Sequence, residues 1–414
     1  MKPTSDPSQF GNEKGISVQH CLVKMLDKIH TQLDTNNQSE AYATIISMID
    51  WSKAFDRQCP KLGVQSFIRN GVRKALIPLL INFFQDRKMQ VKWQGLLSTV
   101  RALPGGGPQG CTTGLLEYKS QTNNNCDFIP PSLRYKWVDD LSILEIINLI
   151  TAGISSYNSK QHVASDVGVD QSYLPSININ TQGYMDKIER WTNENQMKVN
   201  GKKTKLMIIN FTRNYQISTR IYLEGELLEI VKETLLLGCV ITSDLKFHMN
   251  TEHMVKKAYA RMTLLHKLYS FKVATDDLVN IYILYIRSLV EQNVAVWNST
   301  ITQEEVEDIE RVQKVAVRII LKDDYTTYAN ALEYLNLETL QVRRHSLCLR
   351  FAKQCLKNEK MAEMFPQNPG YNAKVRYSEK YEVKFANNNR LRDSSIPDLQ
   401  RLLNEDNRQS QARK

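Results

Sequence analysis

Three aspartates stand at places in the sequence where a carboxylate could take part in chemistry. Asp50 directly follows the apolar run 43–49, which reads as a short buried strand. Asp139 and Asp140 are neighbours inside the segment 134–143, which reads as two strands around a tight turn at this pair. Carboxylate oxygens bind Mg²⁺, and two such ions about 3.5–4 Å apart stabilise both oxygens of an in-line phosphoryl displacement. The pattern therefore permits a two-metal site, although an ordinary turn also explains an Asp-Asp pair.

Five short motifs in a fixed order place these aspartates in a wider pattern. They are Asp50 to Asp56 (DWSKAFD), Leu103 to Gly110 (LPGGGPQG), Trp137 to Leu141 (WVDDL), Asn200 to Lys205 (NGKKTK) and Leu236 to Cys239 (LLGC). In this order and with these gaps, they resemble a reverse transcriptase of the non-LTR (LINE-type, jockey-like) retrotransposon class. The resemblance runs from about residue 9 to about residue 358, and so it covers most of the chain.

In that family, carboxylates are expected to carry the catalysis. The resemblance implies that Asp50 and Asp139 are metal ligands, with Asp140 beside them as the third catalytic and metal-binding carboxylate. It also implies two Mg²⁺ ions as cofactors, with Mn²⁺ as an alternative, and an RNA template, a DNA primer and dNTPs as partners. The reaction is phosphoryl transfer, in which positioning and charge neutralisation supply most of the catalysis.

Further residues are expected to bind the nucleotide and the primer. The resemblance implies that Phe55 stacks near the incoming sugar and rejects a 2′-hydroxyl. It implies that Gln109 borders the nucleotide and the template base, and that Lys203 lies near the triphosphate. It also implies that Leu237 and Gly238 form the primer grip, the hairpin that holds the primer end.

Most of these residues also have a simpler explanation. Phe55 could belong to the hydrophobic core, and Asp56 is expected to be a structural hydrogen-bonding residue. The lysines of the segment 200–205 could lie on a solvated surface. This segment is not a phosphate-binding P-loop, because Gln196 and Lys203 stand where that motif requires Gly and Ser or Thr.

The elements that must position these residues predict an α+β fold. Residues before about 242 read as a mixed unit of strands and helices, and those after about 247 as an all-helical unit. The family resemblance implies that the first is the palm of a right-hand polymerase, an antiparallel sheet with helices, and that the second is a thumb-like region. Within this pattern, 235–241 reads as a strand and 276–297 as a strongly apolar helical segment. The expected organisation is a remnant of the fingers at 1–44, the catalytic palm at 45–242, a helical thumb and post-thumb region at 243–360, and a basic, partly disordered tail at 361–414.

The charge of the chain allows an acidic partner without requiring one. The 414 residues include 54 Lys and Arg against 44 Asp and Glu, which gives a net charge of +10. Basic residues gather at 198–205, with four and no acidic residue, and at 341–360, with six against Glu359 alone. Such segments could follow a phosphate backbone, although a solvated helix face explains any single residue as well.

Cysteine usage and hydropathy predict the compartment. The seven cysteines are scattered without a C-x-x-C pair, which argues against a disulfide framework and a zinc ribbon. No stretch approaches the ~18 consecutive apolar residues of a membrane span, and the polar N-terminus has no signal-peptide core. We therefore expect an intracellular protein, cytoplasmic or nuclear, that is neither secreted nor bound in a membrane.

The sequence departs from the family pattern in three ways. It enters the pattern late, at 9–15, so upstream fingers strands and the usual endonuclease are expected to be absent. Cys111 stands where Ser or Thr is usual, Glu117 falls within a normally apolar run, and Trp137 replaces Phe or Tyr. The leading hypothesis is an RNA-directed DNA polymerase domain. The alternatives are a catalytically inactive relict that at most binds RNA, and a metal-dependent nuclease.

Overall fold

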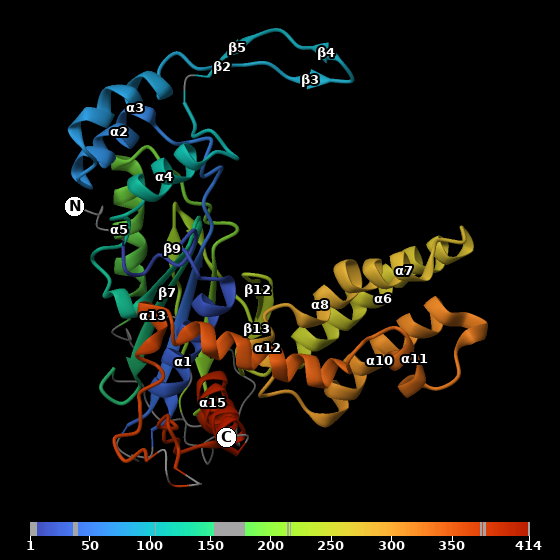
Figure 1. Cartoon of the computed structure of the whole chain (residues 1–414). Helices are drawn as coiled ribbons and strands as arrows, with labels where there is room; N and C mark the ends of the chain where they lie inside the picture. Colours follow the sequence, from blue (N-terminus) through green and yellow to red (C-terminus); the bar gives the residue numbers. More distant parts are fainter. Residues whose placement is uncertain are drawn as a thin grey trace, which may run out of the picture. The chain divides into compact units, whose positions relative to one another are not determined.

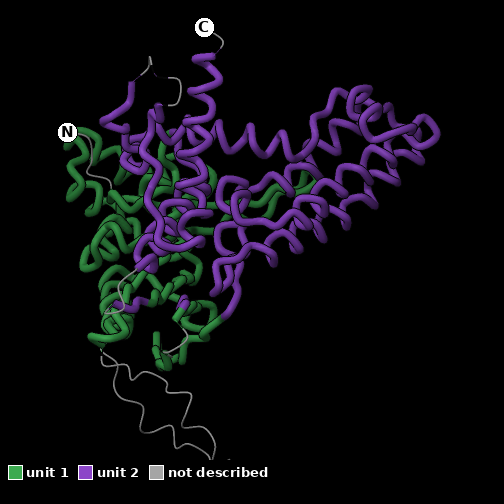
Figure 2. The backbone as a smooth tube through the Cα atoms, turned by 90° about the horizontal axis from the view of Figure 1, so that it is seen from below, with its two compact units in different colours: residues 1–14, 43–208, 212–231 green, residues 15–42, 209–211, 232–414 purple. Residues whose placement is uncertain are grey.

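The computed structural model describes residues 6–35, 40–103, 105–152, 179–212, 215, 217–372, 375 and 378–412. Contacts divide the chain into two units, coloured separately in Figure 2. The first unit comprises residues 1–14, 43–208 and 212–231, and the second comprises residues 15–42, 209–211 and 232–414. The four segments expected from the sequence stay a prediction, but the contacts group residues 15–42 with the C-terminal half of the chain.

A five-stranded sheet forms the centre of the first unit, in the order β11-β8-β1-β7-β6 (Figure 1). Its strands are β1 (Tyr42–Ile49), β6 (Arg134–Trp137), β7 (Asp140–Asn148), β8 (Lys205–Asn210) and β11 (Glu229–Ile230). β6 and β7 pair antiparallel, and β11 pairs parallel with β8. β1 and β7 are inner strands, and their β-branched residues Ile45, Ile46 and Ile143 are almost fully buried, as expected for strands covered on both faces.

Helices and short hairpins complete the first unit. The helices are α2 (Pro60–Arg69), η1 (Lys74–Leu76), α3 (Ile77–Phe84), α4 (Thr112–Gln121), η2 (Pro131–Leu133) and α5 (Thr181–Glu194). The short strands are β2 (Lys88–Met89), β3 (Lys92–Trp93), β4 (Leu96–Leu97), β5 (Arg101–Ala102), β9 (Tyr222–Leu223) and β10 (Glu226–Leu227). α4 begins after Cys111, whose sulfur accepts a hydrogen bond from the Gly114 amide at 3.4 Å. This cysteine therefore does the N-capping that Ser or Thr more commonly does.

Helices dominate the second unit, together with the hairpin of β12 (Glu233–Leu236) and β13 (Cys239–Thr242). The helical segments are α1 (Val18–Leu33), α6 (His248–Ser270), α7 (Thr275–Ile281), η4 (Tyr282–Arg287), α8 (Ser288–Glu291), α9 (Val294–Trp297), α10 (Gln303–Leu321), η5 (Lys322–Asp324), α11 (Tyr328–Tyr334), α12 (Leu340–Cys355), α13 (Glu359–Ala362), α14 (Asn389–Arg392) and α15 (Ser395–Ala412). The predicted α+β class, with mostly antiparallel strand pairs and a helical region after them, is confirmed. None of the helices in the described ranges combines the length and the apolar content needed to cross a membrane.

Two segments of the second unit differ from their sequence prediction. Residues 235–241 do not form one strand, because Leu237 and Gly238 have φ angles of 49° and 78° and make the turn between β12 and β13. The apolar segment 276–297 passes through α7, the π-helical turn η4 and α8, and it breaks at Asn293 before α9. Asn293 has a left-handed φ of 54°, which an α-helix cannot contain.

The C-terminal segment, predicted to be a partly disordered tail, contains one long helix among its described residues. Helix α15 lies within it and packs against α12. Ile396, Leu399 and Leu403 on this helix are almost fully buried, and their spacing places them on one helical face. The polar composition of the segment predicts disorder, but three apolar residues on one face give this helix enough surface to bury.

One buried carboxylate of the first unit has no hydrogen-bond partner among the described residues. α2 and α4 pack so closely that a β-carbon on Gly63 would lie 2.4 Å from Oε1 of Glu117. Glu117 is fully buried, and neither of its oxygens accepts a hydrogen bond within the described ranges. Burial raises the pKa of Glu117 to about 7, against the opposing effect of the Arg87 charge. A glutamate in this normally apolar run therefore destabilises the fold once it is ionised.

The substitution Glu117→Gln is expected to stabilise the chain by about 1–3 kcal/mol at pH 8 and to have little effect at pH 5. The unfolded chain releases this proton near pH 4.5, whereas the folded chain keeps it to about pH 7. The native state thus binds the extra proton between these values, and its stability falls as the pH rises through them. Thermal unfolding at both pH values measures the difference, with the exposed Glu194→Gln as control. Equal shifts at pH 5 and pH 8 would contradict the assignment.

Candidate active site

Asp50 is held at the end of β1 by the loop that precedes β8. The Asp50 amide donates a hydrogen bond to the hydroxyl of Thr204 at 3.2 Å, and its carbonyl accepts one from the Asn200 amide at 2.8 Å. The next residue, Trp51, pairs with Val199 in an antiparallel bridge. Thr204 and Val199 are fully buried, so these contacts fix the point at which the strand ends and the Asp50 side chain begins.

The hairpin of β6 and β7 carries the other two aspartates. Val138 and Asp139 form its two-residue turn, and Asp140 is the first residue of β7, paired with Trp137. The sequence predicts the turn at Asp139 and Asp140, and the structure moves it back by one residue. Val138 has a φ of 57°, which a β-branched residue rarely adopts. This conformation persists only where surrounding groups hold it.

The N-terminal segment holds this turn. Gln9 pairs with Lys136 of β6 in a parallel bridge. Oε1 of Gln9 accepts hydrogen bonds from the amides of Val138, at 3.2 Å, and Gly11, at 2.9 Å. A β-carbon on Gly11 would lie 2.5 Å from the nitrogen of Val138, so glycine is required here. Sequence reasoning missed both supports, because 129 positions separate Gln9 from Val138 and no local signal links them.

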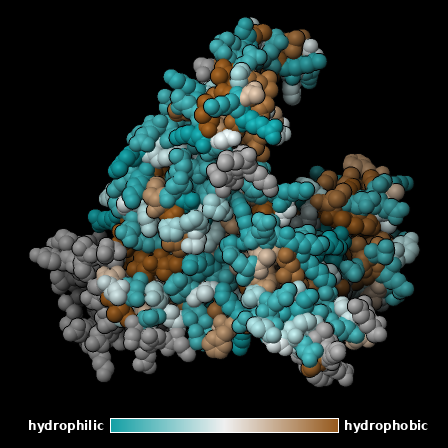
Figure 3. Space-filling view, turned by 60° about the vertical axis from the view of Figure 1, so that its left-hand side comes forward, coloured by the Kyte–Doolittle hydropathy of each residue, from teal (hydrophilic) through white to brown (hydrophobic). Residues whose placement is uncertain are grey.

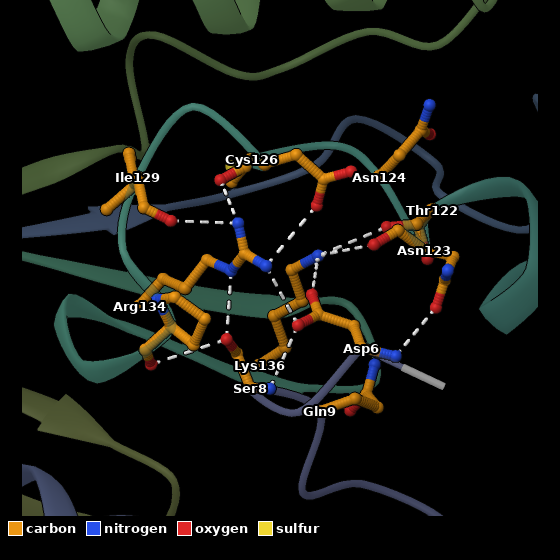
Figure 4. A network of polar contacts seen from close by, with 12 residues as sticks. Asp6, Ser8, Gln9, Thr122, Asn123, Asn124, Cys126, Ile129, Arg134 and Lys136 are labelled. Carbon is orange, nitrogen blue, oxygen red and sulfur yellow. Dashed lines mark hydrogen bonds and ion pairs between the residues drawn. The ribbon is translucent and has the colours of Figure 1, made fainter. Parts of the chain in front are cut away.

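Buried charges fasten the same N-terminal segment to β6. Figure 4 shows the side chains of Arg134 and Lys136 converging on Asp6. Oδ2 of Asp6 lies 2.5 Å from Nζ of Lys136, and Oδ1 lies 3.0 Å from Nη2 of Arg134. Burial by itself would raise the pKa of Asp6, but Lys136, the Ser8 amide and Arg134 lower it below its ordinary value. The cations also donate to the backbone carbonyls of Thr122, Asn123, Cys126 and Ile129.

The three aspartates share one electrostatic environment. The pKa of Asp140, an exposed residue, rises to about 6, first because its carboxyl is partly desolvated and then because the charges of Asp139 and Asp50 lie nearby. Burial raises the pKa of Tyr118, and the charges of Asp139 and Asp140 raise it further. The ring of Tyr118 stacks on Phe55, with ring centres 4.8 Å apart. The first unit therefore brings the end of β1, the β6–β7 turn and Phe55 to one region.

These carboxylates could hold a divalent cation that keeps other ligands. Within the described ranges, no three His, Cys, Asp or Glu side chains are arranged to hold a metal ion between them. Mg²⁺ is commonly bound by one or two carboxylates and keeps water or phosphate oxygens at its other positions. Asp50 and Asp139 could supply those carboxylates, and a bound cation would relieve the like-charge repulsion that, after partial desolvation, raises the pKa of Asp140.

A cavity of about 470 Å³ lies between Phe55 and the loop that carries Gln109. Nε2 of Gln109 donates to Oδ1 of Asp56 at 3.3 Å, and the Gly107 amide donates to the Phe55 carbonyl at 2.7 Å. Gly106 has a φ of 83°, and a β-carbon there would lie 3.1 Å from the Asp56 carbonyl oxygen. Phe55 is half-buried at the cavity wall and Asp56 makes a structural hydrogen bond. The structure thus brings the two predicted nucleotide-binding residues, Phe55 and Gln109, together.

Lys203 lies in the loop that holds Asp50. Its amide donates to the carbonyl of Asn200 at 3.1 Å, and Asn200 in turn bonds to Asp50. Its side chain is exposed and, among the described residues, forms no ion pair. The other lysines of the basic segment each lie 3.6 Å from a glutamate, namely Lys198, Lys202 and Lys205. Lys203 is therefore the lysine of this segment that is left for an anionic ligand.

Leu237 and Gly238, the predicted primer grip, belong to the second unit. They form the tip of the β12–β13 hairpin. The Leu237 carbonyl accepts a hydrogen bond from Nδ2 of Asn293 at 3.1 Å, and a β-carbon on Gly238 would lie 2.4 Å from Nε2 of Gln292. The break in the helical segment before α9 thus backs this turn, and its contact with a primer stays a prediction.

One curated protein is similar to most of this chain. The probable RNA-directed DNA polymerase from transposon BS of Drosophila melanogaster is 22% identical over 345 residues, which are 82% of this chain and 35% of that protein. The resemblance to a transposon RNA-directed DNA polymerase is confirmed. The chain spans about a third of the length of this relative. No protein-family model matches the chain.

Two solved telomerase structures are also similar to the chain, at low scores. Apo telomerase from Candida tropicalis has a TM-score of 0.42 and 14% identity, over 87% of this chain and 52% of that one. Telomerase from Candida albicans in complex with a TWJ fragment of telomeric RNA has a TM-score of 0.33 and 12% identity, over 86% and 54%.

The substitution Asp6→Asn is expected to destabilise the chain by about 3–5 kcal/mol at pH 7, because it leaves Arg134 and Lys136 buried without a countercharge. The stabilisation from Asp6 is present above its unfolded pKa of 3.8 and is lost as the pH falls through the lower folded value. The gap between wild type and variant in urea unfolding should therefore narrow below pH 4.

Asp127→Asn is the matched control for this measurement. Asp127 lies 3.3 Å from the same Arg134, but its side chain is 63% exposed. Removing its charge is expected to change stability by less than about 1 kcal/mol. An effect of Asp6→Asn no larger than that of the control would contradict a structural role for the buried ion pairs.

Proposed function

We propose that the chain is the catalytic part of a transposon reverse transcriptase, an RNA-directed DNA polymerase that extends the 3′-hydroxyl of a DNA primer on an RNA template. The observation that carries the proposal is that Asp50 directly follows β1 and Asp139 directly precedes β7, its neighbour in the sheet, while Phe55 and Gln109 line one cavity of the same unit. The similarity of 82% of the chain to a transposon polymerase supports it. The activity, substrates and partners of the whole polymerase are part of the proposal, since the chain spans 35% of that relative.

In this proposal, Asp50 and Asp139 hold two Mg²⁺ ions, or Mn²⁺ in their place, with Asp140 as the third carboxylate. Bound ions of this kind stabilise the attacking and leaving oxygens of an in-line displacement. The chain itself supplies position. β1 and the bonds of Asn200 and Thr204 fix Asp50. The turn that carries Asp139 is fixed by the N-terminal segment, and such support matters because misplacement by about 1 Å can lower the rate about 100-fold.

The remaining predicted residues act on the substrates. Phe55, held by its stack on Tyr118, forms a wall that excludes a 2′-hydroxyl from the incoming sugar. Gln109 borders the base. Lys203, whose ammonium group forms no ion pair within the described ranges, lies near the triphosphate of the dNTP. Leu237 and Gly238 are assigned to the primer end on the family resemblance.

RNA binding without catalysis is the second candidate function. It is favoured by exposed basic residues of the segments 198–205 and 341–360, such as Lys203, Arg350 and Lys357, which need no catalytic geometry to contact a phosphate backbone.

Primer extension tests the polymerase. With Mg²⁺, dTTP and poly(rA)–oligo(dT), the wild-type chain is expected to incorporate nucleotide, and Asp139→Asn is expected to lower kcat by about 100-fold or more, because one charged ligand is lost. Asp186→Asn on the surface of α5 is the matched control and is expected to keep full activity. RNA binding with no incorporation by the wild type would support the second candidate, and degradation of the template without extension would indicate a nuclease.

Discrimination between sugars tests the cavity. Phe55→Val is expected to raise the ratio of UTP to dTTP incorporation about tenfold or more, because the smaller side chain no longer fills the space of the 2′-hydroxyl. Single-nucleotide kinetics on poly(rA)–oligo(dT) give the two values of kcat/KM. Phe128→Val is the control, since Phe128 is a half-buried aromatic residue of the same unit that packs against Tyr184 instead. An unchanged ratio in Phe55→Val would place the sugar elsewhere.

A further inference from the structure

A two-stranded hairpin of the first unit, residues 87–103, is exposed along almost its whole length, and we call it the arm. It consists of β2 paired with β5 and β3 paired with β4. Gln94 and Gly95, with φ angles of 47° and 84°, make the tight turn at its tip. Figure 1 shows the arm extending away from α2, α3 and α4 of the same unit.

One face of the arm carries an uncovered apolar cluster. Trp93 and Leu96 are directly opposite one another in the register and therefore point to the same side. They are 72% and 76% exposed, and Val91, two residues before Trp93 on that side, is 55% exposed. Figure 3 shows hydrophobic side chains among hydrophilic ones at the top of the view, the level at which Figure 1 places the arm and α3. A two-stranded hairpin is at best marginally stable in water, so this face is suited to a binding partner.

The charge of the arm favours a polyanion as that partner. Residues 87–103 contain four basic residues and no acidic one. Three of them, Lys88, Lys92 and Arg101, are exposed. Lys92 adjoins Trp93 in β3, so the two side chains start on opposite faces of the hairpin, and a strand that stacks on Trp93 would meet Lys92 only by passing round its edge. An aromatic ring together with exposed cations is the combination that binds single-stranded nucleic acid, because bases stack on the ring and phosphates meet the cations. A purely apolar protein partner would gain nothing from this excess of positive charge.

The base of the arm is continuous with the candidate active site. The guanidinium of Arg87 donates to the carbonyls of Gly105 and Gly106, in the loop that leads to Gln109. The Leu103 amide donates to the Arg87 carbonyl at 2.8 Å and closes the base. A hollow of about 750 Å³ is lined both by the arm residues Arg87, Met89 and Leu103 and by Gln109. A strand that reaches Gln109 would therefore pass the foot of the arm.

We infer that the arm is a docking surface for single-stranded RNA, with Trp93 stacking on a base while Lys92 and Arg101 contact phosphates. The inference deepens the proposed function, on which the identification of this strand as the template rests. The binding itself does not depend on catalysis, so the two can fail separately.

The test is the affinity of the full chain for a fluorescently labelled, unstructured 20-nucleotide RNA, measured by anisotropy at several salt concentrations. Trp93→Ala is expected to weaken binding about tenfold, and Trp93→Phe is expected to restore most of the affinity because it keeps an aromatic face. Replacing both Lys92 and Arg101 by Ala is expected to lower the slope of log affinity against log salt by about 1.4. Phe385→Ala removes an exposed aromatic residue (81% exposed) outside the arm and is expected to change neither value.

Asp139→Asn separates this inference from the proposed function, since it is expected to abolish extension and to bind RNA as the wild type does. If the wild type shows no polymerase activity but Trp93→Ala still loses RNA affinity, the arm inference stands and the proposed function falls. If extension is intact but Trp93→Ala binds RNA like the wild type and the salt slope is unchanged, the arm inference is overturned. A Trp93-dependent self-association seen in sedimentation, with no effect on RNA affinity, would overturn it in favour of a protein contact.

Discussion

Repulsion among Asp50, Asp139 and Asp140 is the constraint on which much of the first unit depends. Partial loss of solvent around the Asp140 carboxyl raises its pKa first, and the nearby charges of Asp139 and Asp50 raise it further, so ionising all three groups destabilises the folded chain. They stay together because β1 and β7 are neighbouring inner strands. The free energy gained by burying the side chains of these strands exceeds the free energy that the repulsion costs. The aspartates thus lie where β1 ends and where β7 begins. Carboxylates held close together at the edge of a buried sheet are the arrangement expected where a cation is to be bound.

The turn between β6 and β7 adds a second unfavourable feature, the left-handed backbone of Val138. Its support comes from the N-terminal segment, through the Gln9 side chain and the close approach of Gly11. That segment is fixed in turn by the buried pairing of Asp6 with Lys136 and Arg134. A buried ion pair adds little net stability over an apolar pair of the same size. It does favour one specific pairing, because a buried charge without its partner is strongly destabilising. Its value here is therefore the register that it imposes on the segment next to the Asp139 turn.

The loop with Gln109 links the cavity beside Phe55 to the arm. Hydrogen bonds from this loop to Phe55 and Asp56 hold one side of it, and the Arg87 guanidinium holds the other. Glu117, on the helix that follows the loop, is ionised at a cost to stability above about pH 7. The two departures from the expected sequence pattern therefore differ in effect. Cys111 caps α4 as Ser or Thr would, whereas Glu117, once ionised, destabilises the packing of α4 on α2.

The order of the motifs, the α+β class and the place of Asp50 at a strand end follow from the sequence alone, because they depend on local periodicity and residue type. The grouping of Phe55 with Gln109 also follows from the motifs, although only the structure gives the cavity between them. Contacts between distant residues could not be predicted: Gln9 with Val138, Asp6 with Lys136, and the packing of α15 against α12. Tertiary structure also decided that Lys203 is the lysine of the segment 198–205 without an ion pair among the described residues. The glutamates that pair with the other lysines come from a later hairpin and strand. In each case the contact is stabilised by burial or charge pairing between residues that are distant in the sequence. Local sequence patterns therefore cannot predict it.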